Sequence, residues 1–248
     1  TSGIATDGST TITPSAYSFD QTRGISIIKY SGNGSSGAQL AHGLGAKPSL
    51  FITKRLGTTQ SWAVYHKNMS NTLVTTNTDF DTDAQDYYTK LDTQAARGDS
   101  TNWWHYTAPT SVNMYLGNDD EVNNSSGTYI AYVFSEKRGY SKFHGHKGNS
   151  STDGVFCYTG FRPAWLMIKR VDSGTEDWNI WNDKALGYNV DNNKLYANMS
   201  TIEQTTDEID LVSNGFKIRT TNGGFNSSSG TYIWAAFAEF PIVSSNDV

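Results

Sequence analysis

Short apolar runs alternate with polar loops along the chain from Arg23 onward. Most runs have about four to eight residues and are rich in β-branched and aromatic side chains, while Gly, Asn and Ser fill the segments between them. This pattern predicts β-strands, and because no helical pattern intervenes it favours an antiparallel sandwich or barrel. The predicted strands cover residues 24–30, 49–55, 62–66, 71–76, 112–117, 128–134, 155–161, 164–170, 178–182, 215–221 and 231–240.

The run at 128–134 is apolar on both faces, because side chains alternate between the two sides of a strand. Its two sets are Tyr129, Ala131 and Val133, and Ile130, Tyr132 and Phe134. A strand of this kind is central and covered on both sides. We expect the outer cover to be a second unit, a neighbouring subunit or the next repeat.

The chain repeats itself. Residues 123–136 (NNSSGTYIAYVFSE) return at 226–239 (NSSSGTYIWAAFAE), an offset of 103, and residues 47–55 (KPSLFITKR) return at 162–170 (RPAWLMIKR), an offset of 115. This unit is longer than the roughly 20 to 50 residues of a solenoid repeat. We therefore predict an all-β chain made of two tandem homologous antiparallel β units, the second shorter inside by 13 residues.

We place the unit boundary in the segment RGYSKFHGHKGNS, where a Gly-Asn turn opens the second copy. The expected organisation is a Thr-, Ser- and Gly-rich lead-in at 1–22, a first repeat at 23–143, a second repeat at 144–241 and a C-terminal tail at 242–248. Residues 79–96 are the best helical candidate, although a long loop or one short helical turn is equally compatible with their polarity.

Composition excludes several classes of partner. The net charge is −5 and only 17% of residues are charged, so a basic nucleic-acid-binding surface is not expected. No apolar run approaches the roughly 18 to 20 residues of a membrane span, so we expect no membrane insertion. The single cysteine, Cys157, allows no intrachain disulfide and no zinc cluster, and it is expected to be a buried, inert thiol.

Metal binding is not expected, and neither is any other cofactor. His144 and His146 share a face if they lie on a strand, but no further ligand has suitable spacing, so a solvated turn is favoured. The acidic residues from Asp79 to Asp86 resemble a calcium loop, yet Ala84 stands where such a loop needs Gly, and Lys90 stands where it needs Glu.

Catalytic patterns are also missing. Asp119, Asp120 and Glu121 form one acidic cluster and Glu176 with Asp177 another, but both resemble loop acids rather than an inward-facing carboxylate pair. There is no nucleophile elbow, HExxH motif or phosphate loop. We expect a protein that is not an enzyme.

Aromatic residues give the strongest candidate for a ligand site. Trp103, Trp104 and Tyr106 crowd into a polar segment, and an indole can stack on the apolar face of a sugar while His105, Asp119 and Asp120 hold hydroxyls. Adjacent residues of a strand face opposite ways, so we expect one of the two tryptophans to be exposed. A second set recurs in both units and is interpreted mainly as core: Trp62, Tyr65, Trp178 and Trp181.

Across about residues 15–241, the chain resembles the repeated β domains near the C-termini of bacteriophage tail fibres, which are described as concanavalin-A-like. The similar segments are 26–48, 61–67, 104–111, 127–170 (GTYIAYVFSEKRGYSKFHGHKGNSSTDGVFCYTGFRPAWLMIKR), 213–219 (SNGFKIR) and 230–241 (GTYIWAAFAEFP). HGH after SKF departs from the small polar residues usual at that place.

This resemblance implies two jelly-roll or concanavalin-A-like β-sandwiches in an extracellular virion appendage, a tail fibre or similar structure. It also implies a homotrimer that packs with other virion subunits and contacts a bacterial surface glycan or outer-membrane receptor. No catalytic set transfers from the family. Two alternatives stay open: a polysaccharide-cleaving enzyme on the same scaffold, and a structural or decoration protein of a capsid or extracellular filament.

Overall fold

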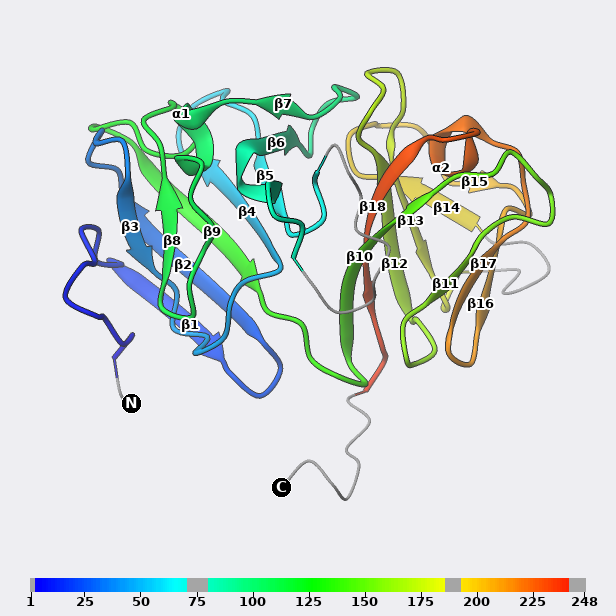
Figure 1. Cartoon of the computed structure of the whole chain (residues 1–248), viewed down its shortest axis with the longest axis horizontal. Helices are drawn as coiled ribbons and strands as arrows, with labels where there is room; N and C mark the ends of the chain where they lie inside the picture. The colour runs from blue at the N-terminus through cyan, green and yellow to red at the C-terminus, as the bar shows by residue number, and fades with distance from the viewer. Residues whose placement is uncertain (1–2, 71–79, 186–192, 241–248) are drawn as a thin grey trace. The chain divides into compact units, whose positions relative to one another are not determined.

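The computed structural model describes residues 3–70, 80–185 and 193–240 (Figure 1). Every pairing between its named strands is antiparallel, and the helices of the described part are single short turns. The predicted all-β antiparallel fold is confirmed. The predicted strand at 71–76 lies outside the described residues.

The chain divides into two compact units. The first comprises residues 1–91 and 97–136, and the second comprises 92–96 and 137–248. Each unit is sandwich-like, because two sheets contribute side chains to a common hydrophobic core.

The first unit has a seven-stranded sheet in the order β1-β2-β9-β4-β5-β6-β7 and a two-stranded sheet of β3 and β8. Its elements are β1 (Ala16–Asp20), β2 (Ile25–Ser31), β3 (Ala38–Ala41), β4 (Leu50–Arg55), β5 (Ala63–His66), η1 (Ala84–Asp86), β6 (Tyr87–Lys90), β7 (Gly98–Asp99), α1 (Thr101–Trp104), β8 (Asn113–Leu116) and β9 (Thr128–Phe134). The described part of the helical candidate at 79–96 contains one 3₁₀ turn, η1, followed by strand β6.

The second unit has a six-stranded sheet in the order β10-β18-β12-β13-β14-β15 and a three-stranded sheet in the order β11-β17-β16. Its elements are β10 (Ser141–Lys147), β11 (Phe156–Tyr158), β12 (Trp165–Arg170), β13 (Trp178–Asn182), β14 (Asn193–Tyr196), β15 (Gln204–Thr205), β16 (Ile209–Val212), β17 (Gly215–Ile218), α2 (Gly223–Asn226) and β18 (Thr231–Phe237). The strands with repeated sequences hold matching places: β9 lies between β2 and β4, and β18 lies between β10 and β12.

Matching side chains meet in the two cores. Tyr30 on β2 stacks on Tyr129 of β9 with ring centroids 5.0 Å apart. At the matching place in the second unit, His146 stacks on Tyr232 at 4.7 Å, and His146 Nε2 lies 2.8 Å from the carbonyl of Phe225. His146 and Tyr30 therefore make similar ring contacts in the two units.

A buried asparagine organises the loops at one end of the first unit. Asn123, which is fully buried, accepts a hydrogen bond from the backbone N–H of Asn33 at 2.9 Å. Its side-chain amide donates to the carbonyls of Ser35 and Gly117, each at 2.9 Å. One side chain thus satisfies three backbone groups that the loops leave without sheet partners.

Asn226 does the same in the second unit. It is fully buried, accepts from the N–H of Asn149 at 3.0 Å, and donates to the carbonyls of Ser151 at 2.8 Å and Thr220 at 2.6 Å. The repeated NNSSG and NSSSG sequences therefore begin with a structural residue, and the turn that precedes β9 or β18 follows it.

The expected unit boundaries differ from those of the structure. Strand β1 lies inside the segment 1–22, where we expected a lead-in, because residues 16–20 pair along the edge of β2. The division between the units falls at 136/137 rather than 143/144, because residues 141–147 form strand β10 and pair with β18.

The location predicted for the pair His144 and His146 also differs from the structure. His144 and His146 lie on β10 and are 4% and 5% exposed, so the predicted solvated turn is wrong. Because they occupy alternate positions of a strand, both face the same side of the sheet, where His144 lies beside Trp234 with ring centroids 5.9 Å apart.

Burial of the central strands does not require a neighbouring subunit. All residues of β18 except Phe237 are buried within the single chain. In β9, Tyr129, Ala131 and Val133 are buried, whereas the alternate set is half-buried. Two-faced apolar strands are therefore no evidence for trimer formation.

A five-residue segment from the first half of the sequence, Asp92–Ala96, belongs to the second unit. Lys169 on β12 is fully buried, and its Nζ donates to the carbonyls of Gln94 at 2.9 Å and Glu176 at 2.5 Å. Gln94 Nε2 donates to Asp177 Oδ1 at 3.0 Å. Burial lowers the pKa of Lys169 to about 8. These contacts attach the segment to β12 and to the loop that follows it.

Candidate functional site

The two adjacent tryptophans lie on a helical turn, so the prediction that one of them is exposed is wrong. Ser100 caps the turn by accepting from the N–H of Asn102, and His105 ends it in a left-handed conformation with φ 54°. Trp103 and Trp104 are 3% and 1% exposed. A helical turn directs neighbouring side chains about 100° apart rather than to opposite faces, so both rings enter the core.

Packing leaves neither ring free to stack on a sugar. Trp103 stacks on Tyr88 with ring centroids 3.7 Å apart. Trp104 meets Phe51 edge to face at 4.6 Å. The central residues of the proposed aromatic site are therefore core residues.

The polar residues of that predicted site are bound to protein groups. The exposed Tyr106 donates its hydroxyl to Asp99, and His105 Nδ1 lies 3.0 Å from Ser36 Oγ. Asp120 accepts from Asn124 Nδ2 at 2.5 Å. Burial, reinforced by a hydrogen bond to the neighbouring carboxyl of Glu121, raises the pKa of Asp119 to about 6.

The recurring aromatic set is mainly core. Tyr65, Trp178 and Trp181 are at most 2% exposed. Trp62 is half-buried and stacks on Tyr132 with ring centroids 6.4 Å apart.

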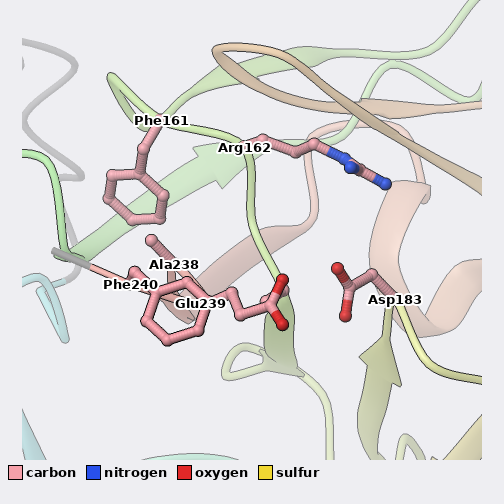
Figure 2. Close-up of a pocket in the computed structure, with 7 residues that line it drawn as sticks. Phe161, Arg162, Asp183, Ala238, Glu239 and Phe240 are labelled. Carbon is pink, nitrogen blue, oxygen red and sulfur yellow. The ribbon is translucent and has the colours of Figure 1, made fainter. Parts of the chain in front are cut away.

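A pocket of about 200 Å³ lies in the second unit, where the chain leaves β13 and β18 (Figure 2). Its lining combines aromatic, carboxylate and guanidinium groups. The lining residues are Phe161, Arg162, Ala164, Asp183, Ala238, Glu239 and Phe240. Pockets for drug-sized ligands have roughly 300–1,000 Å³, so this one admits a single small group or the end of a larger ligand.

Backbone hydrogen bonds fix the two carboxylate-bearing segments. Asp183 directly follows β13, and its N–H donates to the carbonyl of Ala164 at 2.9 Å. Ala238, before Glu239, donates to the carbonyl of Tyr140 at 2.8 Å. Figure 2 shows the carboxyl groups of Asp183 and Glu239 pointing toward one another. Both acids therefore stand on loop positions that the sheet holds in place.

The two carboxylates differ in exposure and partners. The Asp183 side chain is 8% exposed, and the nearest cation among the described residues, Lys184 Nζ, lies 3.8 Å away. Glu239 is 49% exposed and lies 3.0 Å from the same Nζ; this contact raises the pKa of Lys184. Asp183 accepts no side-chain hydrogen bond from the described residues, and its carboxylate oxygens are not fully enclosed by protein.

Phe161 and Phe240 supply the apolar part of the lining. Phe161 is buried, whereas Phe240 is 73% exposed. An exposed ring beside carboxylates and a guanidinium can stack on an apolar ligand face while the charged groups bind its polar groups. The arrangement is suited to binding a small polar ligand.

Sequence reasoning missed this pocket, because its acids stand apart in the chain and match no motif. The repeat contained a signal: Asp183 aligns with Lys67, so the charge at this position is reversed between the two copies. In residues 3–70, 80–185 and 193–240, no group of three or more His, Cys, Asp or Glu is placed to hold a metal ion. Within the same ranges, no helix is long and apolar enough to cross a membrane.

Fold and pocket together define an all-β, sandwich-like protein with a small aromatic and charged pocket in its second unit. The chain belongs to the family described as a domain of unknown function (DUF7483), whose model matches residues 1–241 and so spans both units. No curated protein and no solved structure matches the chain.

Proposed function

We propose that the chain is a non-catalytic host-surface-binding module of a bacteriophage tail fibre or similar virion appendage, and that its receptor is a saccharide. The pocket at Asp183, Glu239 and Phe240 is the observation on which this proposal depends. An exposed phenyl ring beside hydrogen-bonding charged groups is a common arrangement for saccharide recognition. The sequence resemblance to tail-fibre domains supports the same function.

The proposal includes the finer architecture. Two tandem homologous sandwiches, produced by duplication, account for the matching places of β9 and β18 and for the paired roles of Asn123 and Asn226. On this basis the pocket is a feature that the second copy acquired. We also propose assembly as a homotrimer, which light scattering on the purified protein measures directly.

Binding to an array of bacterial surface polysaccharides tests the function. We expect Phe240→Ala to weaken binding to the recognised polysaccharide about tenfold, since stacking on one ring contributes about 1 kcal/mol or more. Tyr158→Ala is the matched control, because Tyr158 is an exposed aromatic residue (49%) outside the pocket. Failure to bind any polysaccharide, or equal effects of the two substitutions, would contradict the proposal.

The same array separates binding from cleavage. A non-catalytic module leaves the bound polysaccharide at its original length, and no reducing ends accumulate during long incubation. Release of reducing ends that is abolished by Asp183→Asn or Glu239→Gln would establish an enzyme instead.

A further inference from the structure

The first unit shows what occupies the place of the pocket when the chain fills it with its own side chains. Lys67 directly follows β5, and its N–H donates to the carbonyl of Ser49 at 2.8 Å. Asp183 directly follows β13 and makes the matching bond to Ala164. Repeat spacing and backbone hydrogen bonding thus agree that Lys67 and Asp183 are equivalent positions.

Glu136 and Glu239 are equivalent by the same criteria. They close the repeated sequences that begin at Asn123 and Asn226. In the first unit, Lys67 Nζ lies 2.7 Å from Glu136 Oε2, and the Lys67 side chain is only 3% exposed. Phe80 completes this cluster, with Lys67 Nζ 5.4 Å from its ring centroid. An ammonium group is therefore bound between a carboxylate and an aromatic ring.

In the second unit the chain supplies no such buried lysine at this position. Asp183 replaces Lys67, and Lys184 replaces Asn68. Lys184 is not one of the residues that line the pocket. Its Nζ lies 3.0 Å from Glu239, and its side chain is 67% exposed. The loop is also shorter in the second unit. In the first unit the paired residues Val64 and Thr89 are 25 positions apart, and the connection between them carries Phe80. In the second unit the paired residues Ile180 and Leu195 are 15 positions apart, so the corresponding connection is ten residues shorter. An open pocket lies beside the added carboxylate.

We infer that this pocket binds a primary ammonium group carried on a surface saccharide, with Asp183 and Glu239 as its hydrogen-bond acceptors and Phe240 beside it. The ligand ammonium reproduces the Lys67–Glu136 pair of the first unit and displaces Lys184 into solvent. This inference rests on the proposed function and specifies the ligand class.

Charge favours an ammonium over an anionic group. With Lys184 withdrawn, the charged lining consists of Arg162, Asp183 and Glu239, a net charge of −1. Displacing Lys184 costs little, because ion pairs of exposed side chains contribute only about 0–1 kcal/mol. Binding adds charge-assisted hydrogen bonds to the carboxylate of Asp183, which accepts no side-chain hydrogen bond from the described residues.

Titration with three sugars that share one ring tests the inference: glucosamine, N-acetylglucosamine and glucose, each followed by NMR chemical-shift changes of the full chain. We expect glucosamine to bind at least about tenfold more tightly than the two neutral sugars. Asp183→Asn should weaken glucosamine binding about tenfold. Asp153→Asn is the matched control, because Asp153 is 87% exposed and paired with Lys217 outside the pocket, and it should change affinity less than twofold.

The direction in which Lys184→Ala changes glucosamine affinity decides between two roles for Lys184. If the ligand ammonium takes the place of Lys184, this substitution should strengthen glucosamine binding about two- to fivefold. If Lys184 instead donates to a neutral sugar, the substitution weakens binding and the inference is overturned. Equal affinity for glucosamine and N-acetylglucosamine also overturns it.

The two proposals can fail separately. Polysaccharide binding that depends on Phe240, without preference for glucosamine, would remove the ammonium inference and leave the function. Preference for glucosamine, without binding to any polysaccharide on the array, would support the pocket chemistry and refute the host-surface function.

Discussion

Asn226→Asp tests whether the buried asparagine holds the loops of the second unit as described. The substitution keeps the volume of the side chain but replaces an amide that donates twice with a carboxylate that only accepts. The bond from the N–H of Asn149 survives. The carbonyls of Ser151 and Thr220, at 2.8 Å and 2.6 Å, lose their donors and face a negatively charged oxygen.

The expected loss of stability follows from these contacts. Leaving a buried polar group unsatisfied costs about 1–3 kcal/mol, and two carbonyls are affected. We expect the free energy of unfolding at pH 7 to fall by about 3–5 kcal/mol, including the cost of the buried charge. The site raises the pKa of the new carboxyl, because burial and two carbonyl oxygens disfavour the anion. The stability lost at pH 7 is therefore partly regained as the pH falls through that raised pKa.

Urea unfolding followed by tryptophan fluorescence measures the difference between variant and unchanged protein at each pH. Asn149→Asp is the control: Asn149 is exposed, so the same chemical change should alter stability by less than about 0.5 kcal/mol. An Asn226→Asp protein within about 1 kcal/mol of the unchanged protein at pH 7, or one further destabilised by acid relative to it, would refute the role assigned to Asn226.

Two further predictions concern buried titratable groups. Burial lowers the pKa of His146 to about 4, below the roughly 6.5 of an unfolded histidine, so the neutral ring favours folding at neutral pH and this stability is lost as the pH drops from about 6.5 to about 4. His146→Phe should therefore reduce the loss of unfolding free energy between about pH 7.5 and pH 5 by about 2 kcal/mol, measured by urea unfolding; an unchanged pH dependence would contradict this. Burial raises the pKa of the Cys157 thiol far above its usual range, so a disulfide reagent monitored by absorbance should react at the rate of unfolding; reaction at the rate of a free peptide thiol would show that Cys157 is accessible.

The alternation of short apolar runs with polar loops was sufficient to predict the all-β fold, because it is a local property of the sequence. The predicted strands at 128–134 and 178–182 match β9 and β13 residue for residue. Strand β1 was missed, because this edge strand is largely exposed and lies in a Thr-, Ser- and Gly-rich segment without a sustained apolar run.

The buried tryptophans show why a local pattern misled. The expectation that one of Trp103 and Trp104 is exposed treated them as adjacent residues of a strand. The capping Ser100 and the left-handed His105 instead make a single helical turn. Tertiary packing against Phe51 and Tyr88 then determines the burial of both rings, and the partner rings lie in distant segments.

The pocket could not be predicted from either of its acids alone. Asp183 and Glu239 each resemble an ordinary loop residue. They line one pocket because β13 and β18 both run antiparallel to β12 and so end at the same edge of the sheet. Comparison of the two repeats would have identified the exchange of Lys67 for Asp183. It could not have shown that Asp183 and Glu239 line the same pocket, because that depends on how the ends of two distant strands are placed in the fold.

The hydrogen bond from Lys169 to Gln94 limits how the protein can be cut into two fragments. A gene fragment encoding only residues 137–248 omits Asp92–Ala96, so the ammonium of Lys169 loses one of its two carbonyl acceptors and Asp177 loses the amide of Gln94. Fusing this pentapeptide to the C-terminal half, or adding it in trans, would restore both contacts. The two units are interleaved in sequence, because Asp92–Ala96 belongs to the second, and a single cut cannot separate them intact.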